Sequence, residues 1–506
     1  MQQSVVDNKR VAKNAVTLYF RMLFQMAVYL YTSRVVIQVL GLSDFGIYDV
    51  VGGVVGILVF LNNSMVGCTQ RFITFAIGKG DNDYLKKVYS ASLSIHIGMA
   101  LLVLLLGETV GLWYVENFLE LPMGRHEEAM VVYHCSLLAS MLMIVNVPYN
   151  ATIIAYERMT AFAVITILDV LLKLSIVLAL PHLFGYDLLI LYAILLLIES
   201  LIMRIVYGAY CHLTFKNLYF VWVRDKALYK EMVFFAGWST FGNFALVCNT
   251  QGLNLVLNGV GGTLLNAARG TAFQVQTAVT AFTASFQTAV NPQITKSYAA
   301  GNVDAMNQLI LRSSKFSFFL LCFLAIPLGV EMETVLNLWL TDVPEYAVVF
   351  TRLLLCVSLV DAIANPMMIG AAATGRIKKY HLIIGITLFS ALPLAALVSH
   401  ITKRPESVFE TQLFIVVLTQ CIRMHLCKDL YRFSLKNFIR YVLYPILRVC
   451  PLALLVTYVA HHHLTGGFMG VFFVVAVSTI VLASLIYVLG LTKGERDFIL
   501  SKIKRK

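Results

Sequence analysis

Residues 467–491 read GFMGVFFVVAVSTIVLASLIYVLGL, a stretch of 25 residues without one charged side chain. The hydrocarbon core of a bilayer is about 30 Å thick, and an α-helix of about 20 apolar residues crosses it. The stretch therefore predicts a transmembrane helix. Thirteen further stretches of suitable length, bounded by polar turns, lie at 15–40, 45–77, 88–115, 129–155, 160–180, 187–213, 232–258, 263–295, 316–339, 346–374, 380–400, 409–428 and 441–461.

The composition of the 506 residues excludes ordinary soluble domains, since 59% are hydrophobic, only 13% are charged and the mean hydropathy is +0.79. The apolar runs are continuous rather than alternating, which favours helices over a transmembrane β-barrel. Residues 5–13 lack the apolar core of a cleaved signal peptide. The predicted fold class is all-α: a polytopic membrane protein with about 14 transmembrane helices.

The formal net charge of +12 is distributed unevenly along the chain. Most of the 39 Lys and Arg residues lie in the two termini and in the loops on the same side as the termini, whereas the opposite loops hold only Arg125, Lys403 and Arg404. The positive-inside rule then places both termini in the cytoplasm, and the basic surplus requires no nucleic-acid partner. The nine cysteines lack metal-ligand spacing, so neither a metal nor a cofactor is expected.

An internal repeat is indicated by three pairs of residues, each separated by 218 positions: Gly41 and Gly259, Pro148 and Pro366, and Arg158 and Arg376. Matching spans of the same orientation predict two parallel six-helix lobes with a central cavity between them. The expected divisions are an N-lobe at 1–213, a cytoplasmic linker at 214–231, a C-lobe at 232–430, and two additional helices with a basic tail at 431–506.

Polar side chains recur at helical spacing along the eighth span. At steps of 7, 4, 3, 4 and 4, the stripe comprises Arg269, Gln276, Thr280, Thr283, Gln287 and Asn291. The seventh span adds Asn243 and Asn254, and the first adds Gln25. Such a stripe would be costly against lipid, so it faces either a water-filled cavity, which we favour, or a dry interhelical hydrogen-bond network.

Four intramembrane arginines, Arg21, Arg34, Arg71 and Arg269, would make the predicted cavity positive. Guanidinium groups bind phosphate through paired donors, so an anionic headgroup is the expected cargo.

Three intramembrane acids, Asp169, Glu199 and Asp361, are candidates for coupling transport to an ion gradient, with a proton or sodium as the coupling cation. Each could equally be a structural partner of a nearby arginine. Asp169 and Lys173 are four residues apart and can neutralise each other on one helix face, or form a protonation-linked switch.

Several segments resemble Wzx-type polysaccharide and O-antigen flippases of the multidrug/oligosaccharidyl-lipid/polysaccharide (MOP) exporter superfamily, whose fold is MATE-like. The resemblance is carried by Lys13–Arg21, Thr32–Val36, Leu40–Tyr48 and Arg71–Phe72. It implies alternating access and a cargo of undecaprenyl-pyrophosphate-linked oligosaccharide, moved across the bacterial inner membrane. It also implies cavity arginines that engage the pyrophosphate, membrane lipid as a partner, and other polysaccharide-assembly proteins as potential partners.

Three other functions stay open at this point. A MATE-type multidrug or cation exporter would share the fold, although the absence of an acid in the first span argues against it. A lipid II flippase is a second alternative. A membrane glycan polymerase would be an enzyme, but the outer loops are short and no catalytic motif occurs, so we expect the protein not to be an enzyme.

Overall fold

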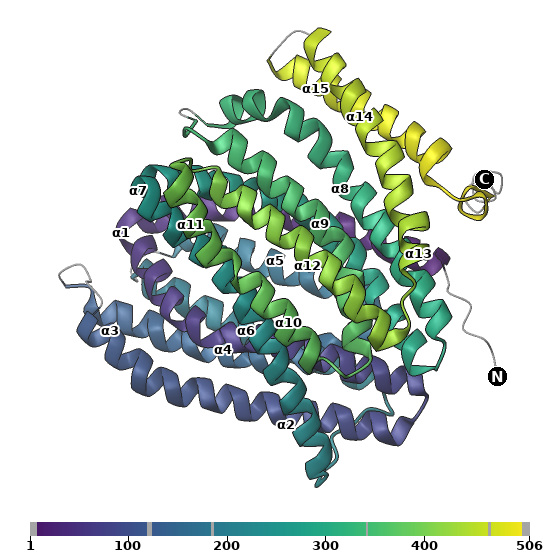
Figure 1. Ribbon diagram of the computed structural model, residues 1–506. Coiled ribbons are helices and arrows are strands. Elements are labelled where there is room, and N and C mark those ends of the chain that lie inside the picture. The colour runs from purple at the N-terminus through teal and green to yellow at the C-terminus, as the bar shows by residue number, and fades with distance from the viewer. Residues whose placement is uncertain (1–7, 119–123, 184–186, 341–342, 464–466, 498–506) are drawn as a thin grey trace. The chain divides into compact units, whose positions relative to one another are not determined.

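A computed structural model describes residues 8–118, 124–183, 187–340, 343–463 and 467–497, apart from some side chains in the first and seventh helices. Over these residues the chain is almost entirely helical (Figure 1). The α-helices are α1 (Asn8–Lys79), α2 (Asn82–Leu106), α3 (Leu112–Phe118), α4 (His126–Ala155), α5 (Met159–Ala179), α6 (Leu188–Thr214), α7 (Lys226–Ala299), α8 (Val303–Trp339), α9 (Ala347–Ala373), α10 (Lys378–Phe389), α11 (Ala391–Thr402), α12 (Ser407–Tyr431), α13 (Leu435–Phe438), α14 (Tyr444–His463) and α15 (Phe468–Leu485).

The helices account for every predicted span, which confirms the all-α, multi-pass fold class. Helices α1 and α7 contain 72 and 74 residues, so each is several times longer than a bilayer is thick and includes two predicted spans. The predicted span at 380–400 is divided into α10 and α11. Within the described residues, nine helical segments are long and apolar enough to cross a membrane.

A kink at Gly41 divides α1 at the predicted outer turn. The residue has φ 79° and ψ 164°, a conformation that glycine adopts without the steric penalty of a Cβ atom. Its predicted counterpart, Gly259, is not among the glycines with positive φ in the described part of α7. The prolines match better, since Pro148 lies inside α4 and Pro366 inside α9.

The chain forms two compact units, Met1–Thr240 (unit 1) and Phe241–Lys506 (unit 2), with their boundary inside α7. In unit 1, α4 packs against α1, α2 and α6. The π-helical turn that follows α2, Gly107–Gly111, begins and ends with glycines that lie directly against side chains of α4. A Cβ atom on Gly111 would lie only 2.3 Å from the Tyr133 hydroxyl, which donates a hydrogen bond to the Gly107 carbonyl.

Arg125 joins three helices of unit 1 at one end of the bundle. Its guanidinium donates to Asp44 in α1 and to Asp187, the N-cap of α6, and it also contacts Glu128 in α4 at 3.3 Å. These contacts raise the pKa of Arg125. Burial alone would raise the pKa of Asp187, but hydrogen bonds from Arg125 and from the backbone N–H groups of α6 lower it overall.

This arrangement predicts that unit 1 loses stability in acid. A carboxyl whose pKa is lower in the folded state stabilises the fold above its unfolded pKa, and that contribution disappears as the pH falls through the folded value. We therefore expect the difference in melting temperature between the wild type and Asp187→Asn to be full at neutral pH and to shrink below about pH 4. Thermal unfolding of both purified proteins, from neutral pH to below about pH 4, measures this difference in melting temperature. A difference that grew on acidification would contradict the prediction.

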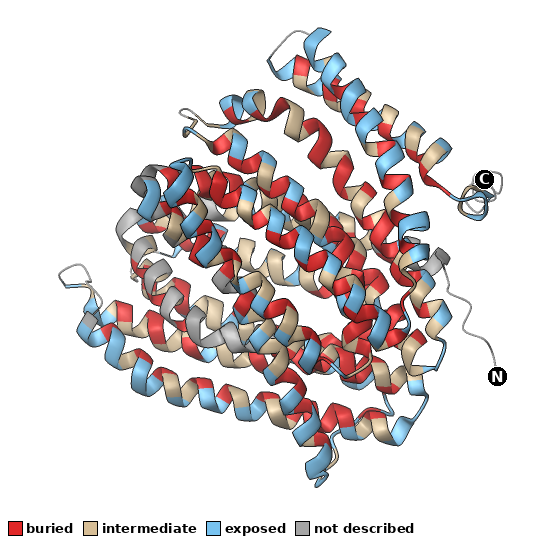
Figure 2. Ribbon diagram, viewed as in Figure 1, coloured by how far each residue is buried: buried red, intermediate tan, exposed pale blue. Residues whose placement is uncertain are grey.

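In unit 2, α9 is central and packs against α8 and α12. In the most apolar segment of α9, 56% of the residues are buried. In the corresponding segment of Phe468–Gly490, which contains α15, 17% are buried (Figure 2). The hairpin of α14 and α15 lies against α8, and it is connected to α8 by a hydrogen bond from α14 and by an ion pair from the segment after α15. Lys315 of α8 donates to Glu495 at 2.6 Å, and Glu331 of α8 lies 2.6 Å from the ring nitrogen of His461.

Candidate functional site

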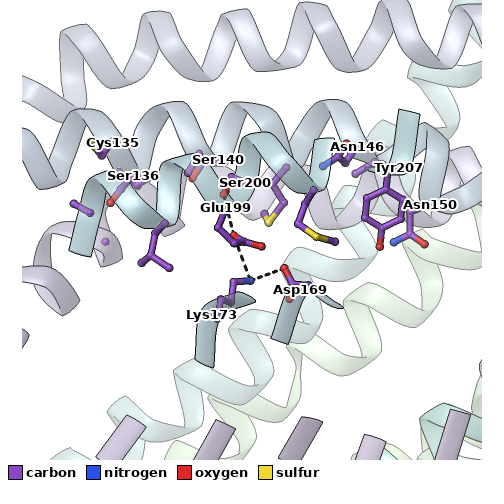
Figure 3. A pocket seen from close by; sticks show the side chains of 18 of the residues that line it. Cys135, Ser136, Ser140, Asn146, Asn150, Asp169, Lys173, Glu199, Ser200 and Tyr207 are labelled. Atoms are coloured by element: carbon purple, nitrogen blue, oxygen red, sulfur yellow. Dashed lines mark hydrogen bonds and ion pairs between the residues drawn. The ribbon is translucent and has the colours of Figure 1, made fainter. Parts of the chain in front are cut away.

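Unit 1 encloses a cavity of about 640 Å³, which we call the unit 1 cavity (Figure 3). Side chains of α1, α4, α5 and α6 line it. Three of them belong to residue types that ordinarily carry a charge at neutral pH: Asp169 and Lys173, one turn apart on α5, and Glu199 on α6. The cavity therefore holds two carboxyl groups and one amino group.

The charged side chains of the unit 1 cavity lie close together. The Lys173 ammonium donates to Asp169 at 2.8 Å and lies 3.9 Å from Glu199 Oε2. Only 3% of the Glu199 side chain is exposed, whereas Asp169 is 29% exposed. The pair on α5 thus forms as its spacing predicts, and Glu199 has a lysine rather than an arginine as its nearby cation.

Helix α4 contributes amide groups to the same cavity. The Oδ1 atoms of Asn146 and Asn150 are buried, and neither accepts a hydrogen bond from a described residue. The same holds for Oε1 of Glu199. Three acceptors without donors make this cavity suited to a cation or a proton-donating ligand.

Unit 2 encloses a second cavity, of about 290 Å³, which we call the unit 2 cavity. Its lining includes Arg269 of α7, Asp361 of α9 and Arg423 of α12. Each arginine is only 8% exposed. The arginines outnumber the carboxylate, so this cavity favours anions.

Neutral groups orient Arg423 and fill much of the remaining wall of the unit 2 cavity. Arg423 Nε donates to the Tyr380 hydroxyl at 2.9 Å, and its Nη1 donates to Gln420 at 2.7 Å. On another part of the wall, Gln412 donates to Asn249 at 3.0 Å. The Gln412 Oε1 atom is buried without a described donor, so it can accept from a ligand.

Two predicted residues of the first span lie beside the unit 1 cavity rather than among its lining residues. The Arg21 guanidinium stacks 4.6 Å from the centre of the Phe162 ring in α5, and its buried Nε has no described acceptor. Gln25 approaches the carbonyl of Thr166 at 3.5 Å. Both therefore contribute to the packing of α1 on α5.

Arg71 of the predicted headgroup set occupies an aromatic enclosure instead of either cavity. Its guanidinium lies 4.5, 4.9 and 5.2 Å from the ring centres of Phe72, Phe75 and Phe235, and 4.0 Å from Glu231. This geometry gives Arg71 a structural role in joining α1 to the start of α7. The side chain of Arg34, the remaining predicted arginine, lies outside the described residues.

The predicted polar stripe of α7 divides into a part that lines the unit 2 cavity and a part that packs against helices. Arg269, Gln276 and the earlier Asn243 line the cavity. Gln287 is 6% exposed and donates to Ser317 and to the Ala362 carbonyl, each at 3.1 Å, so it lies in a dry contact.

The other members of the predicted polar set are not among the lining residues of the unit 2 cavity. Thr280 donates to the Gln276 carbonyl within its own helix, and Thr283 is buried. The Oδ1 atoms of Asn254 and Asn291 are buried without described donors. Gln276 is thus the last member of the stripe along α7 that lines the unit 2 cavity.

Several residues that line the cavities were not among the site residues predicted from the sequence. Arg423 is an arginine inside a predicted span, and that signal alone could have identified it. No local signal distinguishes Asn146, Asn150 or His381, since each reaches its cavity only through helix packing. Gly242 makes room for His381, because a Cβ atom there would lie 2.2 Å from the ring nitrogen.

No group of three or more His, Cys, Asp and Glu side chains that could hold a metal ion occurs within the described residues. The predicted absence of a metal site concerns the whole chain and stays a prediction.

Comparison with solved structures connects this architecture to known transporters. The chain is similar to an outward-facing multidrug resistance MATE transporter of the MOP superfamily, with a TM-score of 0.70 and 14% identity, over 85% of this chain and 98% of that one. The MATE transporter ClbM in complex with Rb⁺ has a TM-score of 0.70 at 16% identity, over 85% and 96%. A MATE structure in the straight conformation has a TM-score of 0.70 and 15% identity, over 83% of this chain and 95% of that one. The fold is MATE-like.

No protein-family model matches the sequence, and no curated protein does. The similarity therefore establishes the fold.

Proposed function

We propose that this protein is a transporter of the MOP superfamily, rather than an enzyme, and that it flips an undecaprenyl-pyrophosphate-linked oligosaccharide. The proposed direction is from the cytoplasmic to the periplasmic leaflet of a bacterial inner membrane, by alternating access, with both chain termini in the cytoplasm. The oligosaccharide is a repeat unit of O-antigen or capsule. The short segments between the helices and the MATE-like fold support a transporter.

The observation that carries this proposal is the charge of the unit 2 cavity. Arg269 and Arg423 are both almost fully buried beside a single carboxylate, Asp361. Guanidinium groups present paired donors that match phosphate oxygens, and a low dielectric strengthens the attraction. A cavity built for a cationic drug would require the opposite balance of charge.

The neutral side chains of the unit 2 cavity suit the sugar part of the cargo. Asn249, Gln276, Gln412 and Thr419 supply amide and hydroxyl groups, and Phe273 and Phe409 supply aromatic rings. Sugar hydroxyls both donate and accept, so amides that can do the same provide specificity.

The amphipathic character of the cargo determines which part needs a cavity. The pyrophosphate and the sugars cannot enter hydrocarbon without a large cost in free energy, whereas the polyprenyl tail is soluble there. We propose that the headgroup uses polar cavities while the tail stays in the bilayer.

The unit 1 cavity supports a second element of the proposal, coupling to an ion gradient. Its two carboxyl groups, Asp169 and Glu199, and its unpaired acceptors suit a coupling cation. ClbM, which has a similar fold, has been solved in complex with Rb⁺. Asp361 in unit 2 is a further candidate, although it interacts electrostatically with Arg423.

The decisive experiment is a glycan-export assay in bacteria that lack their own flippase. We expect Arg269→Ala to lower export about tenfold to a hundredfold at normal protein level, because a charge-assisted hydrogen bond contributes about 1.5–3 kcal/mol and each 1.4 kcal/mol is tenfold. Arg269→Lys should retain part of the export. Arg312→Ala, at an exposed position of α8, is the matched control and should leave export unchanged. Normal export by Arg269→Ala would refute the assignment.

A MATE-type multidrug or cation exporter is the second candidate, favoured by the fold and by the acidic unit 1 cavity. Drug susceptibility measured in the same strains separates the two functions. Protection against cationic drugs without glycan export would establish the rival. Complementation of peptidoglycan synthesis tests the lipid II alternative in the same way.

A further inference from the structure

The three charged groups of the unit 1 cavity, Asp169, Lys173 and Glu199, come from two helices and lie close together (Figure 3). Lys173 and Asp169 form a short pair, at 2.8 Å. Glu199 lies farther from the ammonium, at 3.9 Å, and the Asp169 carboxyl is close enough to interact with it directly. One ammonium therefore serves two neighbouring carboxylates.

Glu199 is the less well satisfied of the two acids. Its side chain is 97% buried, since 3% is exposed. Its Oε1 atom has no hydrogen-bond donor among the described residues, and Oε2 has two long contacts, from Ser200 at 3.5 Å and from the Lys173 ammonium at 3.9 Å. Burying a carboxylate without donors costs free energy, and binding a proton removes that cost. Asp169 has a short contact with the ammonium and a larger exposed fraction than Glu199, so the free-energy cost of its charged form is smaller.

The other ionisable side chains facing the cavity do not change this balance. They are Tyr48 from α1, Cys135 from α4 and Tyr207 from α6 itself, all uncharged at neutral pH in their ordinary state. Arg21, which lies beside the cavity, interacts electrostatically with Tyr207.

The Lys173 ammonium lies near both carboxylates, so its charge would repel a metal ion bound between them. An alkali-metal ion bridging both carboxylates would lie about 4 Å from the ammonium, and repulsion at that distance weakens binding by up to about a thousandfold at an intermediate dielectric constant. A proton covalently attached to Glu199 adds no separate ion to the cavity.

We propose that Lys173 is a tethered counter-cation that keeps alkali-metal ions out of the unit 1 cavity, so that the exchangeable ion is a single proton carried on Glu199. The proton enters from water on one side of the membrane, forms an O–H bond on the Glu199 carboxylate and makes the three-group cluster neutral. Its release to water on the other side restores the negative charge. This rests on the proposed ion-coupled transport, but proton occupancy can be measured without any transported substrate.

The first test is infrared difference spectroscopy of the purified protein in nanodiscs as the pH is changed. The wild type should show a C=O stretching component of a protonated carboxylic acid that titrates with pH. Glu199→Gln should lose this component, and Asp361→Asn, which changes an acid in the other cavity, should keep it. Persistence of the component in Glu199→Gln would overturn the proposal.

The second test measures binding of radioactive sodium to the same samples. The wild type and Lys173→Arg, which keeps the cation, should show no saturable binding, whereas Lys173→Met should gain at least a tenfold increase in affinity. Saturable binding to the wild type that Glu199→Gln abolishes would show a metal-ion site instead and would refute the proposal. If Lys173→Met does not fold, the infrared spectra and the sodium-binding measurement on the wild type still test whether the exchangeable ion is a proton on Glu199.

These outcomes are separate from the identity of the cargo. If Glu199 binds a proton but the protein exports drugs and no glycan, this inference holds and the proposed function is wrong. Glycan export driven by a saturable sodium site would do the reverse.

Discussion

Glu495→Gln is expected to destabilise unit 2 by about 3–5 kcal/mol, the usual cost of removing one partner from a buried ion pair. Lys315 is 2% exposed and Glu495 is 12% exposed, so the substitution leaves the ammonium buried with the Gly490 carbonyl as its other contact, at 3.3 Å. Burial alone would raise the pKa of Glu495, but Lys315 and the Thr492 N–H lower it overall, so the carboxylate is charged at neutral pH. The lost pair should release the chain after α15, and we expect faster proteolysis there and a lower melting temperature.

Two further variants separate the charge effect from damage to the fold. Lys315→Met/Glu495→Met replaces the pair by apolar side chains, and buried pairs replaced in this way often lose no stability. The double variant should therefore recover most of the stability that Glu495→Gln loses. Glu333→Gln, at an exposed position of α8, is the matched control. Equal losses of stability in the single and double variants would show that the unpaired buried ammonium is not the cause of the loss, and would contradict the prediction.

Arg125→Ala is expected to cost unit 1 about 2–4 kcal/mol, because it removes charge-assisted hydrogen bonds that connect α1, α4 and α6. The estimate is reduced for partial exposure, since 29% of the Arg125 side chain and 27% of the Asp187 side chain are exposed. The remaining carboxylates would also repel one another. Thermal unfolding of the purified variant measures the loss.

Arg125→Lys and Arg404→Ala complete that experiment. Lysine keeps the charge but cannot reproduce the forked geometry of a guanidinium, so it should recover only part of the stability. Arg404 is 58% exposed and pairs with Glu406 and Glu410, two and six residues further along the chain, so its loss should be within about 1 kcal/mol. A melting temperature for Arg125→Ala equal to that of Arg404→Ala would contradict the structural role of Arg125.

Local patterns predicted several features of the fold and one contact of the candidate site. The turn expected at Gly41 is a kink with positive φ, and the spacing of Asp169 and Lys173 forms the ion pair that it permits. Both features depend on residues within one or two helical turns. Their geometry therefore follows from local backbone preferences and helix periodicity.

The surroundings of Arg71 and Gln287 depend on residues far away in the chain and could not be predicted from local patterns. Arg71 satisfies every local criterion for a cavity arginine, yet Phe235, more than 160 residues away in the chain, helps to enclose it. Gln287 belongs to the same stripe as Gln276, but the packing of α7 against α8 and α9 places it in a dry contact. Hydropathy cannot distinguish a polar residue that faces water from one that faces another helix.

The amino-acid sequence alone was sufficient to establish that this is a multi-pass helical membrane protein, because each span depends on the composition of about 20 consecutive residues. The tertiary structure was needed to show that carboxylates gather around Lys173 in unit 1 and arginines gather in unit 2. The reason is physical: charges from helices far apart in the chain act on one another only where packing brings them within a few ångströms.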